Sequence, residues 1–291
     1  MHIASTVDEL RDRVQGWRAA GLTVGLVPTM GALHDGHLDL VRHARALADR
    51  IVTSIFVNPT QFGPNEDFDR YPRTFDTDCA ALASVGCDAV FAPSVAAMYP
   101  PGFQTRVEVT RLPQHLCGLG RPGHFAGVTL VVLKLFNACE PDIAVFGEKD
   151  YQQVRVIEQM VRDLDCRVRI VRHPTVREAD GLARSSRNRY LTADERSRAP
   201  VLYATLSDMA ARIAAGATDA AALADEGRAV IRAAGLAVEY LSIVDPDTLD
   251  DVAAIGGPVR LLVAARLGAT RLIDNVGADP ATAPRAMEDA T

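Results

Sequence analysis

The chain has 291 residues, of which 48% are apolar, and a formal net charge of −6. Its length suffices for two domains or one large one, and its composition is that of a globular protein. It contains no run of 18 apolar residues and no charged-then-apolar leader, which argues against a membrane span or a secretory signal. The mild acidity argues against general nucleic-acid binding.

Five cysteines are spread along the chain without a Cys-x-x-Cys pair. An odd number of unclustered cysteines favours free thiols in a reducing compartment over a disulfide framework or a zinc site. We therefore expect a cytoplasmic protein whose side chains hold no resident metal.

Short apolar runs alternate with helical patterns through the first 175 residues. The expected strands are 23–27, 51–57, 89–92, 143–146 and 167–171, and the expected helices are 38–50, 75–85, 125–139 and 152–164. Continuous apolar strands separated by helices predict a parallel sheet covered on both faces. The fold class is therefore α/β, with a Rossmann-like doubly wound parallel sheet. A proline- and glycine-rich interruption, 99–123, contains one more expected strand at 105–110.

The pattern changes after His173-Pro174. Two alanine-rich helices are expected at 193–215 and 219–234, followed by strands at 238–244, 259–265 and 270–273. These elements predict a smaller α+β C-terminal domain. The predicted division is 1–175 for the first domain, 176–276 for the second, and 277–291 for a tail expected to be disordered.

The most informative segment is Thr29 to His37, which lies between the apolar run 22–28 and a helical pattern. A helix N-terminus directs backbone N–H groups and a positive dipole end toward an anion. His34 and His37 would add imidazole donors, and Gly36, which has no Cβ, would admit a phosphate or purine. An ordinary capped helix start is the alternative, and a zinc site lacks a third ligand at suitable spacing. The segment predicts a nucleotide phosphate site.

A second polar segment, Gly147 to Gln153, also follows a strand and opens a helix. Only two of the 31 basic residues are lysines, Lys134 and Lys149. A lysine retained against that bias favours a need for a compact ammonium. Lys149 could reach a triphosphate and Asp150 ribose hydroxyls; the alternative is a capped helix start with solvated charge.

Two further segments carry candidate chemistry. Ala183 to Arg189, at the domain boundary, combines arginines, serines and an asparagine suited to polyphosphate, unless it is simply an exposed basic loop. Asn58 to Gly63 follows a strand and offers uncharged polar groups to a small hydroxy acid. We find no nucleophile triad, no P-loop and no Gly-x-Gly-x-x-Gly after the first strand.

Taken in order, these segments resemble the pantoate–β-alanine ligase (pantothenate synthetase) family of the HxGH-type nucleotidyltransferase-like superfamily. Other matching segments are 71–74, 121–125 and 175–190, with weaker matches at 240–249 and 264–275. The resemblance therefore extends to about residue 276.

This resemblance implies a C–N ligase. ATP, with Mg²⁺ on its phosphates, and pantoate would give pantoyl adenylate and pyrophosphate; β-alanine would then displace AMP to form pantothenate. It also implies a homodimer with small-molecule substrates and no nucleic-acid or membrane partner. Because hydrolysis of the adenylate would waste ATP, we expect the second domain to close as a lid. Two alternatives predict other behaviour: a different HxGH transferase would need a basic acceptor pocket, and a silent nucleotide sensor would bind ATP without forming AMP.

Residue roles follow from the same resemblance. His37 would donate to a phosphate oxygen, with His34, Lys149 and Arg187 as further catalytic residues, and Gln61 and Gln153 would hold pantoate or β-alanine. The implied ATP contacts are Met30, Gly31, Ala32, Leu33, His34, Asp35, Gly36, His37, Gly147, Glu148, Lys149, Asp150, Val176, Arg184, Ser185, Ser186 and Arg187. Arg184 departs from the family, which usually has methionine there.

Overall fold

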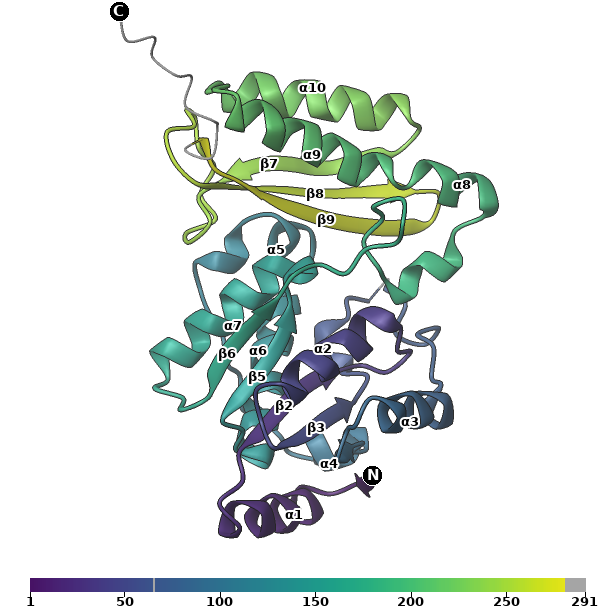
Figure 1. The fold of residues 1–291 in the computed structure, drawn as a ribbon, viewed down its shortest axis with the longest axis vertical. Helices are drawn as coiled ribbons and strands as arrows, with labels where there is room; N and C mark the ends of the chain where they lie inside the picture. Colours follow the sequence, from purple (N-terminus) through teal and green to yellow (C-terminus); the bar gives the residue numbers. More distant parts are fainter. Residues whose placement is uncertain (65, 281–291) are drawn as a thin grey trace, which may run out of the picture. The chain divides into compact units, whose positions relative to one another are not determined.

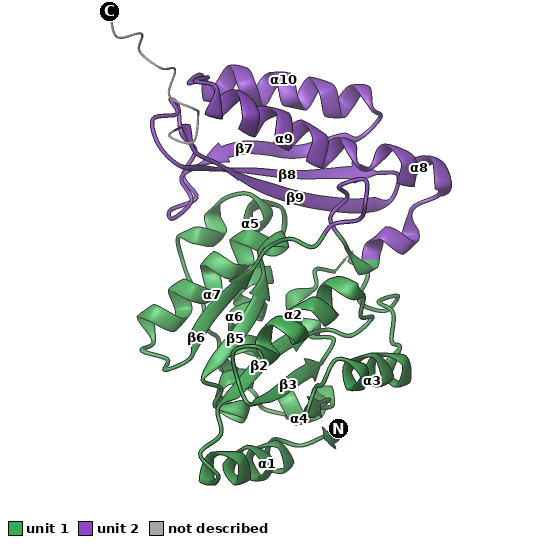
Figure 2. Ribbon diagram, viewed as in Figure 1, with its two compact units in different colours: residues 1–176, 184–186 green, residues 177–183, 187–291 purple. Residues whose placement is uncertain are grey.

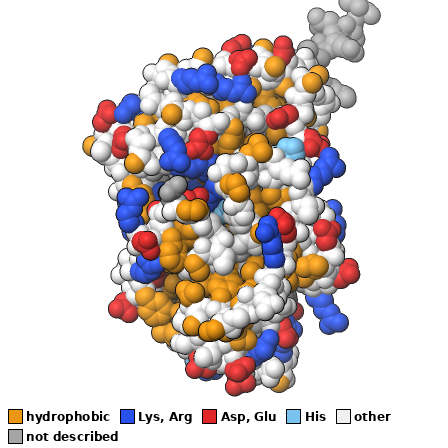
Figure 3. Space-filling model, turned by 180° about the vertical axis from the view of Figure 1, so that it is seen from behind, with side chains coloured by type: hydrophobic (Ala, Val, Ile, Leu, Met, Phe, Trp, Pro, Cys, Tyr) orange, Lys and Arg blue, Asp and Glu red, His pale blue; other side chains and the backbone are white. Residues whose placement is uncertain are grey.

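The computed structural model describes residues 1–64 and 66–280 (Figure 1). Two compact units divide the chain (Figure 2): the first comprises residues 1–176 with 184–186, and the second comprises 177–183 with the chain from 187 onward. On the face drawn in Figure 3, charged side chains of both signs are interspersed, and hydrophobic side chains gather over part of the first unit.

The first unit is built on a six-stranded parallel sheet. Its order is β1-β4-β3-β2-β5-β6. The strands are β1 (His2–Ala4), β2 (Val24–Thr29), β3 (Arg50–Ile55), β4 (Ala89–Phe91), β5 (Ile143–Gly147) and β6 (Arg169–His173). Every residue of β4 is buried, as are most of β2, β3 and β5, because helices cover both faces of the sheet.

Helices α2 (Asp35–Arg45) and α3 (Phe75–Ser84) cover one face. Val41 of α2 and Leu82 of α3 are fully buried in one cluster with Val27, Ile51 and Val145 of the strands. Three helices pack against one another in sequence, α1 with α6 and α6 with α7, and the last two also contact β2 and β5. They are α1 (Val7–Ala19), α6 (His124–Cys139) and α7 (Tyr151–Asp163).

The strand order reverses direction at β2. From β2 the chain moves to β3 and then β4 on one side, and it later returns to place β5 and β6 on the other side. A crevice forms at such a switch point, outside the carboxyl ends of the two adjacent strands. The segments that follow β2 and β5 therefore meet at the place where this fold binds ligands.

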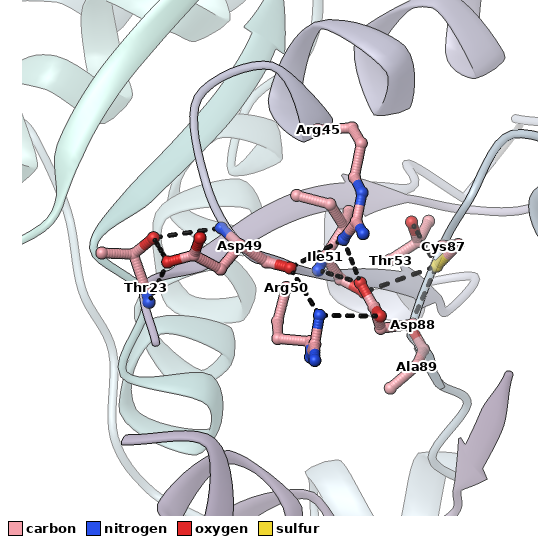
Figure 4. A network of polar contacts seen from close by, with 9 residues as sticks. All are labelled: Thr23, Arg45, Asp49, Arg50, Ile51, Thr53, Cys87, Asp88 and Ala89. Carbon is pink, nitrogen blue, oxygen red and sulfur yellow. Dashed lines mark hydrogen bonds and ion pairs between the residues drawn. The ribbon is translucent and has the colours of Figure 1, made fainter. Parts of the chain in front are cut away.

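The opposite, amino edge of the sheet is tied by a polar network (Figure 4). The Asp88 carboxylate accepts the Ile51 N–H at 2.8 Å and pairs with Arg45 at 2.8 Å and Arg50 at 3.8 Å. Asp49 accepts both the N–H and the hydroxyl of Thr23, at 2.9 and 2.7 Å. These bonds fix where β2 and β3 begin, so the network is structural.

The second unit packs two long helices on a three-stranded antiparallel sheet. The sheet order is β7 (Ala237–Val244), β8 (Val259–Leu267) and β9 (Thr270–Ala278). Helices α9 (Val201–Ala214) and α10 (Ala220–Ala233) contact the sheet and each other. Buried Asp274 forms a bidentate ion pair with Arg177, at 2.6 and 2.9 Å. The guanidinium of Arg177 also lies over the Tyr203 ring.

The predicted fold class, a doubly wound parallel sheet with a smaller α+β domain, is confirmed, but several predicted elements are wrong in detail. The expected strand 105–110 is not a strand: residues 105–109 have no regular secondary structure and residue 110 is a bend. Helix α2 stops at Arg45, because Asp49 must turn to bind Thr23. The expected helix 193–215 is two helices, α8 (Ala193–Arg198) and α9, interrupted at Pro200, which has no N–H to donate.

Both ends of the chain also differ from expectation. Strand β1 and helix α1 were not predicted, although Thr6 and Glu9 form a capping box at the start of α1. The tail was expected from residue 277, but Gly277 and Ala278 belong to β9; residues 281–291 of that expectation lie outside the described residues. The first unit also contains the short helices α4 (Val95–Met98) and α5 (Cys117–Gly120) and the 3₁₀ turns Pro59–Gln61, Leu112–Gln114 and Glu148–Asp150.

Candidate active site

The loop that follows β2 is hydrogen-bonded through its backbone to Asp78 of α3. This carboxylate is 3% exposed and accepts the N–H groups of Ala32 and Leu33, both at 2.9 Å. Gly31 and Ala32 have positive φ angles of 78° and 51°, which turn the chain from β2 toward α2. The backbone donors of Ala32 and Leu33 are thus already engaged, so the loop is a rigid support for the start of α2.

His34 and His37 cap helix α2 reciprocally. The Gly36 N–H donates to Nδ1 of His34 at 3.1 Å, and the His34 N–H donates to Nδ1 of His37 at 3.4 Å. Because a backbone N–H can only donate, each Nδ1 is an acceptor and each neutral ring carries its proton on Nε2. The ring centroids are 4.0 Å apart. The start of the helix therefore presents two imidazole Nε2–H donors. The Gly36 N–H, which was expected to face an anion, is instead bonded to the His34 ring.

His37 is kept neutral by its surroundings. Desolvation holds its pKa well below the ordinary value of 6.5, and the nearby His34 and Lys149 lower the pKa further. Lys149 lies in the 3₁₀ turn Glu148–Asp150 after β5, and its side chain is 22% exposed. Lys149 follows β5, which is the neighbour of β2 in the sheet, and its charge is one of the causes that lower the pKa of His37. Two neutral donors and one cation thus converge at the switch point.

Gly36 is required by the His34 ring. A Cβ at position 36 would lie 2.9 Å from both Cε1 and Nδ1 of that ring, closer than Cβ atoms are found. Glycine is therefore needed at position 36 to leave room for the ring of His34, one of the candidate catalytic residues.

The polar turn after β3 fixes Gln61 on both sides. Its Oε1 accepts the Asn58 amide at 3.0 Å, and its Nε2 lies 3.2 Å from the Met30 sulfur. Asn58 also donates to the Gly127 carbonyl at 3.1 Å. A Cβ at Gly127 would lie 2.3 Å from the Thr60 carbonyl oxygen, so only glycine lets α6 approach this turn. Gln61 is oriented before any ligand arrives.

A second polar group, to which sequence reasoning assigned no role, holds the backbone of Gln61. His124 Nδ1–H donates to the Gln61 carbonyl at 2.8 Å, and Nε2 of the ring accepts from Arg121 at 2.9 Å. Arg121 forms a bidentate ion pair with Glu66 at 2.6 and 2.5 Å. Desolvation, aided by the Arg121 charge, lowers the pKa of His124 to about 4. The neutral ring is what this bonding pattern requires.

The neighbouring glutamines of α7 have different roles. Gln152 is buried and donates to the carbonyls of Leu112 and His115, while its Oε1 accepts the Cys117 N–H at 3.0 Å. Gln153 is partly exposed and makes no side-chain hydrogen bond within the described part of the chain. Gln152 is therefore structural, whereas the amide of Gln153 remains available to a ligand.

The serine-rich loop is anchored on the first unit at both ends. The Arg184 N–H donates to the Val176 carbonyl at 2.9 Å, and the Arg184 guanidinium forms an ion pair with Asp35 at the start of α2. The Ser186 hydroxyl lies 3.5 Å from the hydroxyl of buried Tyr71. Ser185 lies between these anchors, and the next residue after Ser186, Arg187, belongs to the second unit.

The remaining predicted ATP contacts belong to the turn after β5. Gly147 ends the strand, Glu148 lies 3.9 Å from Arg172, and the Asp150 carboxylate lies 3.8 Å from Lys149. In the first unit the structure thus gathers the segments after β2, β3 and β5 at one edge of the sheet, together with residues 184–186.

An adjoining pocket of about 320 Å³ opens beyond the ends of β2, β3 and β4. Met30 and Gly31 line it together with apolar residues that include Ile55, Phe68 and Val95. It contains none of His34, His37, Lys149, Gln61 or Gln153. The pocket therefore borders the candidate active site but is not that site.

The described residues contain no group of three or more His, Cys, Asp or Glu side chains able to hold a metal ion. All five cysteines are free. Over the same residues, no helix combines the length and apolar character that crossing a membrane requires.

Comparison with known proteins identifies close relatives. Residues 2–277 match the family model described as pantoate-beta-alanine ligase. The chain is 54% identical over 282 residues to the pantothenate synthetase of Paramagnetospirillum magneticum, covering 96% of this chain and 99% of that one. It is 56% identical over 270 residues to the pantothenate synthetase of Alkalilimnicola ehrlichii, covering 92% and 94%.

Solved structures agree with these matches. Pantothenate synthetase from Thermus thermophilus superimposes with a TM-score of 0.88 at 48% identity, covering 95% of this chain and 99% of the other. A pantoate-beta-alanine ligase from Francisella tularensis, complexed with beta-gamma ATP and beta-alanine, gives a TM-score of 0.80 at 35% identity, covering 95% and 97%.

Proposed function

This chain belongs to the pantoate–β-alanine ligase family, and we propose that the donors at the β2–β5 switch point carry out its reaction, the ATP-dependent joining of pantoate to β-alanine. The observation that carries the proposal is the capping of α2 by His34 and His37, which directs two Nε2–H donors away from the helix beside Lys149.

In the first step the pantoate carboxylate attacks the α-phosphorus of ATP. A P–O bond forms to the acyl oxygen, the bond to the β-phosphate breaks, and pyrophosphate leaves. Such a displacement needs positioning and charge stabilisation more than a protein nucleophile. His34 and His37 donate to phosphate oxygens through Nε2–H, and Lys149 neutralises negative charge on the same group. A donor of this kind is worth about 3 kcal/mol of barrier.

In the second step the neutral amine of β-alanine attacks the acyl carbon of the adenylate. The C–N bond forms, the carbon–oxygen bond to the phosphate breaks, the amine loses a proton and AMP leaves. Gln61 and Gln153 hold the hydroxyl and carboxyl groups of the small substrates. The prior orientation of Gln61 by Asn58 and His124 lowers the entropic cost of that binding.

Magnesium enters with ATP in this proposal. Asp78 is committed to backbone N–H groups and Asp35 to Arg184, so these nearby carboxylates do not form a cage. Mg²⁺ commonly binds through substrate phosphates and water with few protein ligands, which fits this donor set. The ion would supply charge neutralisation on the triphosphate.

The ATP contacts of Ser185, Ser186 and Arg187, and closure of the second domain, also belong to the proposal. Small-angle scattering with and without a pantoyl-adenylate analogue tests closure; an unchanged radius of gyration would contradict it. We further propose that the protein is a homodimer. We also propose that it is cytoplasmic, since five free thiols fit a reducing compartment.

One assay tests the function. Pyrophosphate release should require ATP and pantoate, and AMP release should rise further with β-alanine. Pyrophosphate release that requires a phosphorylated acceptor would indicate another nucleotidyl transferase. ATP binding without AMP formation would indicate a nucleotide sensor.

A further inference from the structure

A group of four charged side chains adjoins the turn that carries Lys149. Its members come from three neighbouring elements of the first unit: Glu148 from the 3₁₀ turn after β5, Arg155 and Glu158 from α7, and Arg172 from β6. Two of them are positive and two are negative. Sequence reasoning assigned a role to Glu148 alone, so the other three have no part in the function proposed above.

Arg172 is the central member of this group. The Glu158 carboxylate accepts from Nε and Nη2 of Arg172, both at 2.6 Å, and from Nη1 of buried Arg155 at 2.8 Å. The pKa of Arg172 is raised above its ordinary value, chiefly by the hydrogen bonds to Glu158 and also by one to Tyr151. A bidentate pair of this kind fixes the plane of the guanidinium as well as its position.

The remaining contacts of Arg172 reach both ends of the turn. Its Nη1 lies 3.9 Å from Oε1 of Glu148, the residue before Lys149. Its guanidinium carbon lies 5.6 Å from the ring centroid of Tyr151, which is 3% exposed and begins α7 two residues after Lys149. The sheet register agrees, because Arg172 is paired with Phe146 of β5, just before the turn. Arg172 therefore contacts the turn on both sides of the lysine.

We propose that Arg172, oriented by Glu158, is a positioning residue for Lys149. By holding Glu148 and Tyr151 it sets where the backbone of Lys149 lies, and so where the ammonium can reach. The inference rests on the proposed function, in which Lys149 neutralises charge on the phosphates. A charge that is placed in advance stabilises the transition state without reorganising during the reaction.

A double-mutant cycle with Lys149 tests the inference. In a chain with Lys149, R172Q should lower the kcat of pyrophosphate release about tenfold, because a small misplacement of a catalytic group can cost up to about 10²-fold. In the K149A chain, R172Q should cost less than about a further twofold, since two residues that act as one unit are not additive. E158Q, which weakens the same ion pair from the other side, should behave likewise. An equal loss with and without Lys149 would overturn the inference, because a purely structural arginine acts regardless of the lysine.

The matched control is R212Q in the second unit. Arg212 also contacts two carboxylates, Glu226 at 2.7 Å and Asp208 at 3.9 Å, and its side chain is 42% exposed, compared with 32% for Arg172. R212Q therefore removes the same charge from a comparable pair and should leave kcat unchanged. Circular dichroism should show that every variant folds. A loss of kcat in R212Q as large as that in R172Q would contradict a role specific to Arg172.

A second measurement does not depend on activity. Lys134 and Lys149 are the only lysines of the chain, so carbon-13-labelled lysine gives two side-chain signals, which K134R assigns. R172Q should shift the Lys149 signal and leave that of Lys134 in place, and R212Q should shift neither. An unchanged Lys149 signal in R172Q would overturn the inference. A wild-type chain that releases no pyrophosphate from ATP and pantoate would overturn the proposed function instead, while the signal shift would still stand.

Discussion

The Arg184 guanidinium is ion-paired with the Asp35 carboxylate, which ties the serine-rich loop to the first residue of the helix that carries both histidines. The family resemblance places methionine at position 184, so this tie is a feature of the present chain. Asp35 is 65% exposed and Arg184 29% exposed, so the pair is a modest contribution to stability. Its importance lies in charge, because an unpaired Asp35 would repel the phosphates of ATP.

R184M should therefore raise the KM for ATP by about fivefold, which corresponds to about 1 kcal/mol. The double variant R184M/D35N should restore most of the affinity, because it removes the uncompensated carboxylate. Steady-state kinetics at two salt concentrations would measure both effects. Purely additive changes in the two single variants and the double variant would rule out the coupling.

G36A should impair adenylation at least tenfold while the fold is retained. The added Cβ would contact Cε1 and Nδ1 of His34 and force that ring from its place. G16A is the matched control: Gly16 lies in α1 with nothing within 4 Å of an added Cβ, and alanine favours helix by about 1 kcal/mol. Pyrophosphate release should fall in the first variant only, and near-normal release by G36A would disprove the proposed seat.

H37A should depress pyrophosphate release by a factor of about 10² or more, with the thermal transition nearly unchanged. The unmodified ring should also keep its neutral Nε2–H form at pH 6, because desolvation holds its pKa well below 6.5. Nitrogen-15 shifts of the labelled imidazole report both protonation and tautomer. A ring that gains its second proton near pH 6.5 would contradict this description.

K149R should be poorly active although the charge is kept, because a planar guanidinium cannot replace a compact ammonium beside the histidine pair. The control is K134R, since the Lys134 ammonium lies over the rings of Phe103 and Tyr99 at 5.0 and 6.0 Å, where arginine also stacks. Turnover numbers measured for both variants decide the matter. Equal activity would remove the argument based on lysine scarcity.

The protein should lose stability as the pH falls from 6.5 toward 4. The pKa of His124 is lowered to about 4 in the folded protein, so the unfolded chain binds protons first and folding weakens below pH 6.5. At pH 5 this contributes about 2 kcal/mol. Urea unfolding at pH 7.5 and pH 5 should show a smaller loss for H124Q than for the wild type. An equal loss in both would show that another group dominates.

Local patterns predicted most of the parallel sheet. The apolar runs that became β2, β3 and β5 are buried on both faces, so composition alone marks them. The segment 105–110 alternates valines with polar residues as a strand does, yet a strand also needs a neighbour, which no local pattern supplies. Helix α1 was missed although its capping box is a local signal, because the three-residue strand before it gives no apolar run.

The sequence predicted the candidate donor residues of the site, but not the residues that hold their loops in place. His34, His37 and Lys149 follow strand ends that adjoin in the sheet, so topology brings them together. Asp78 reaches the loop from 45 residues away, and His124 reaches Gln61 from 63 residues away. Contacts of that separation depend on how helices pack, which sequence spacing does not encode.

The polar network around Asp88 lies at the amino edge of the sheet, whereas the histidines and Lys149 lie past the carboxyl edge. A six-residue strand separates the two edges by about 20 Å. Effects of substitutions that far apart usually add. Substitutions that reinforce the amino edge should therefore raise thermal stability without altering turnover.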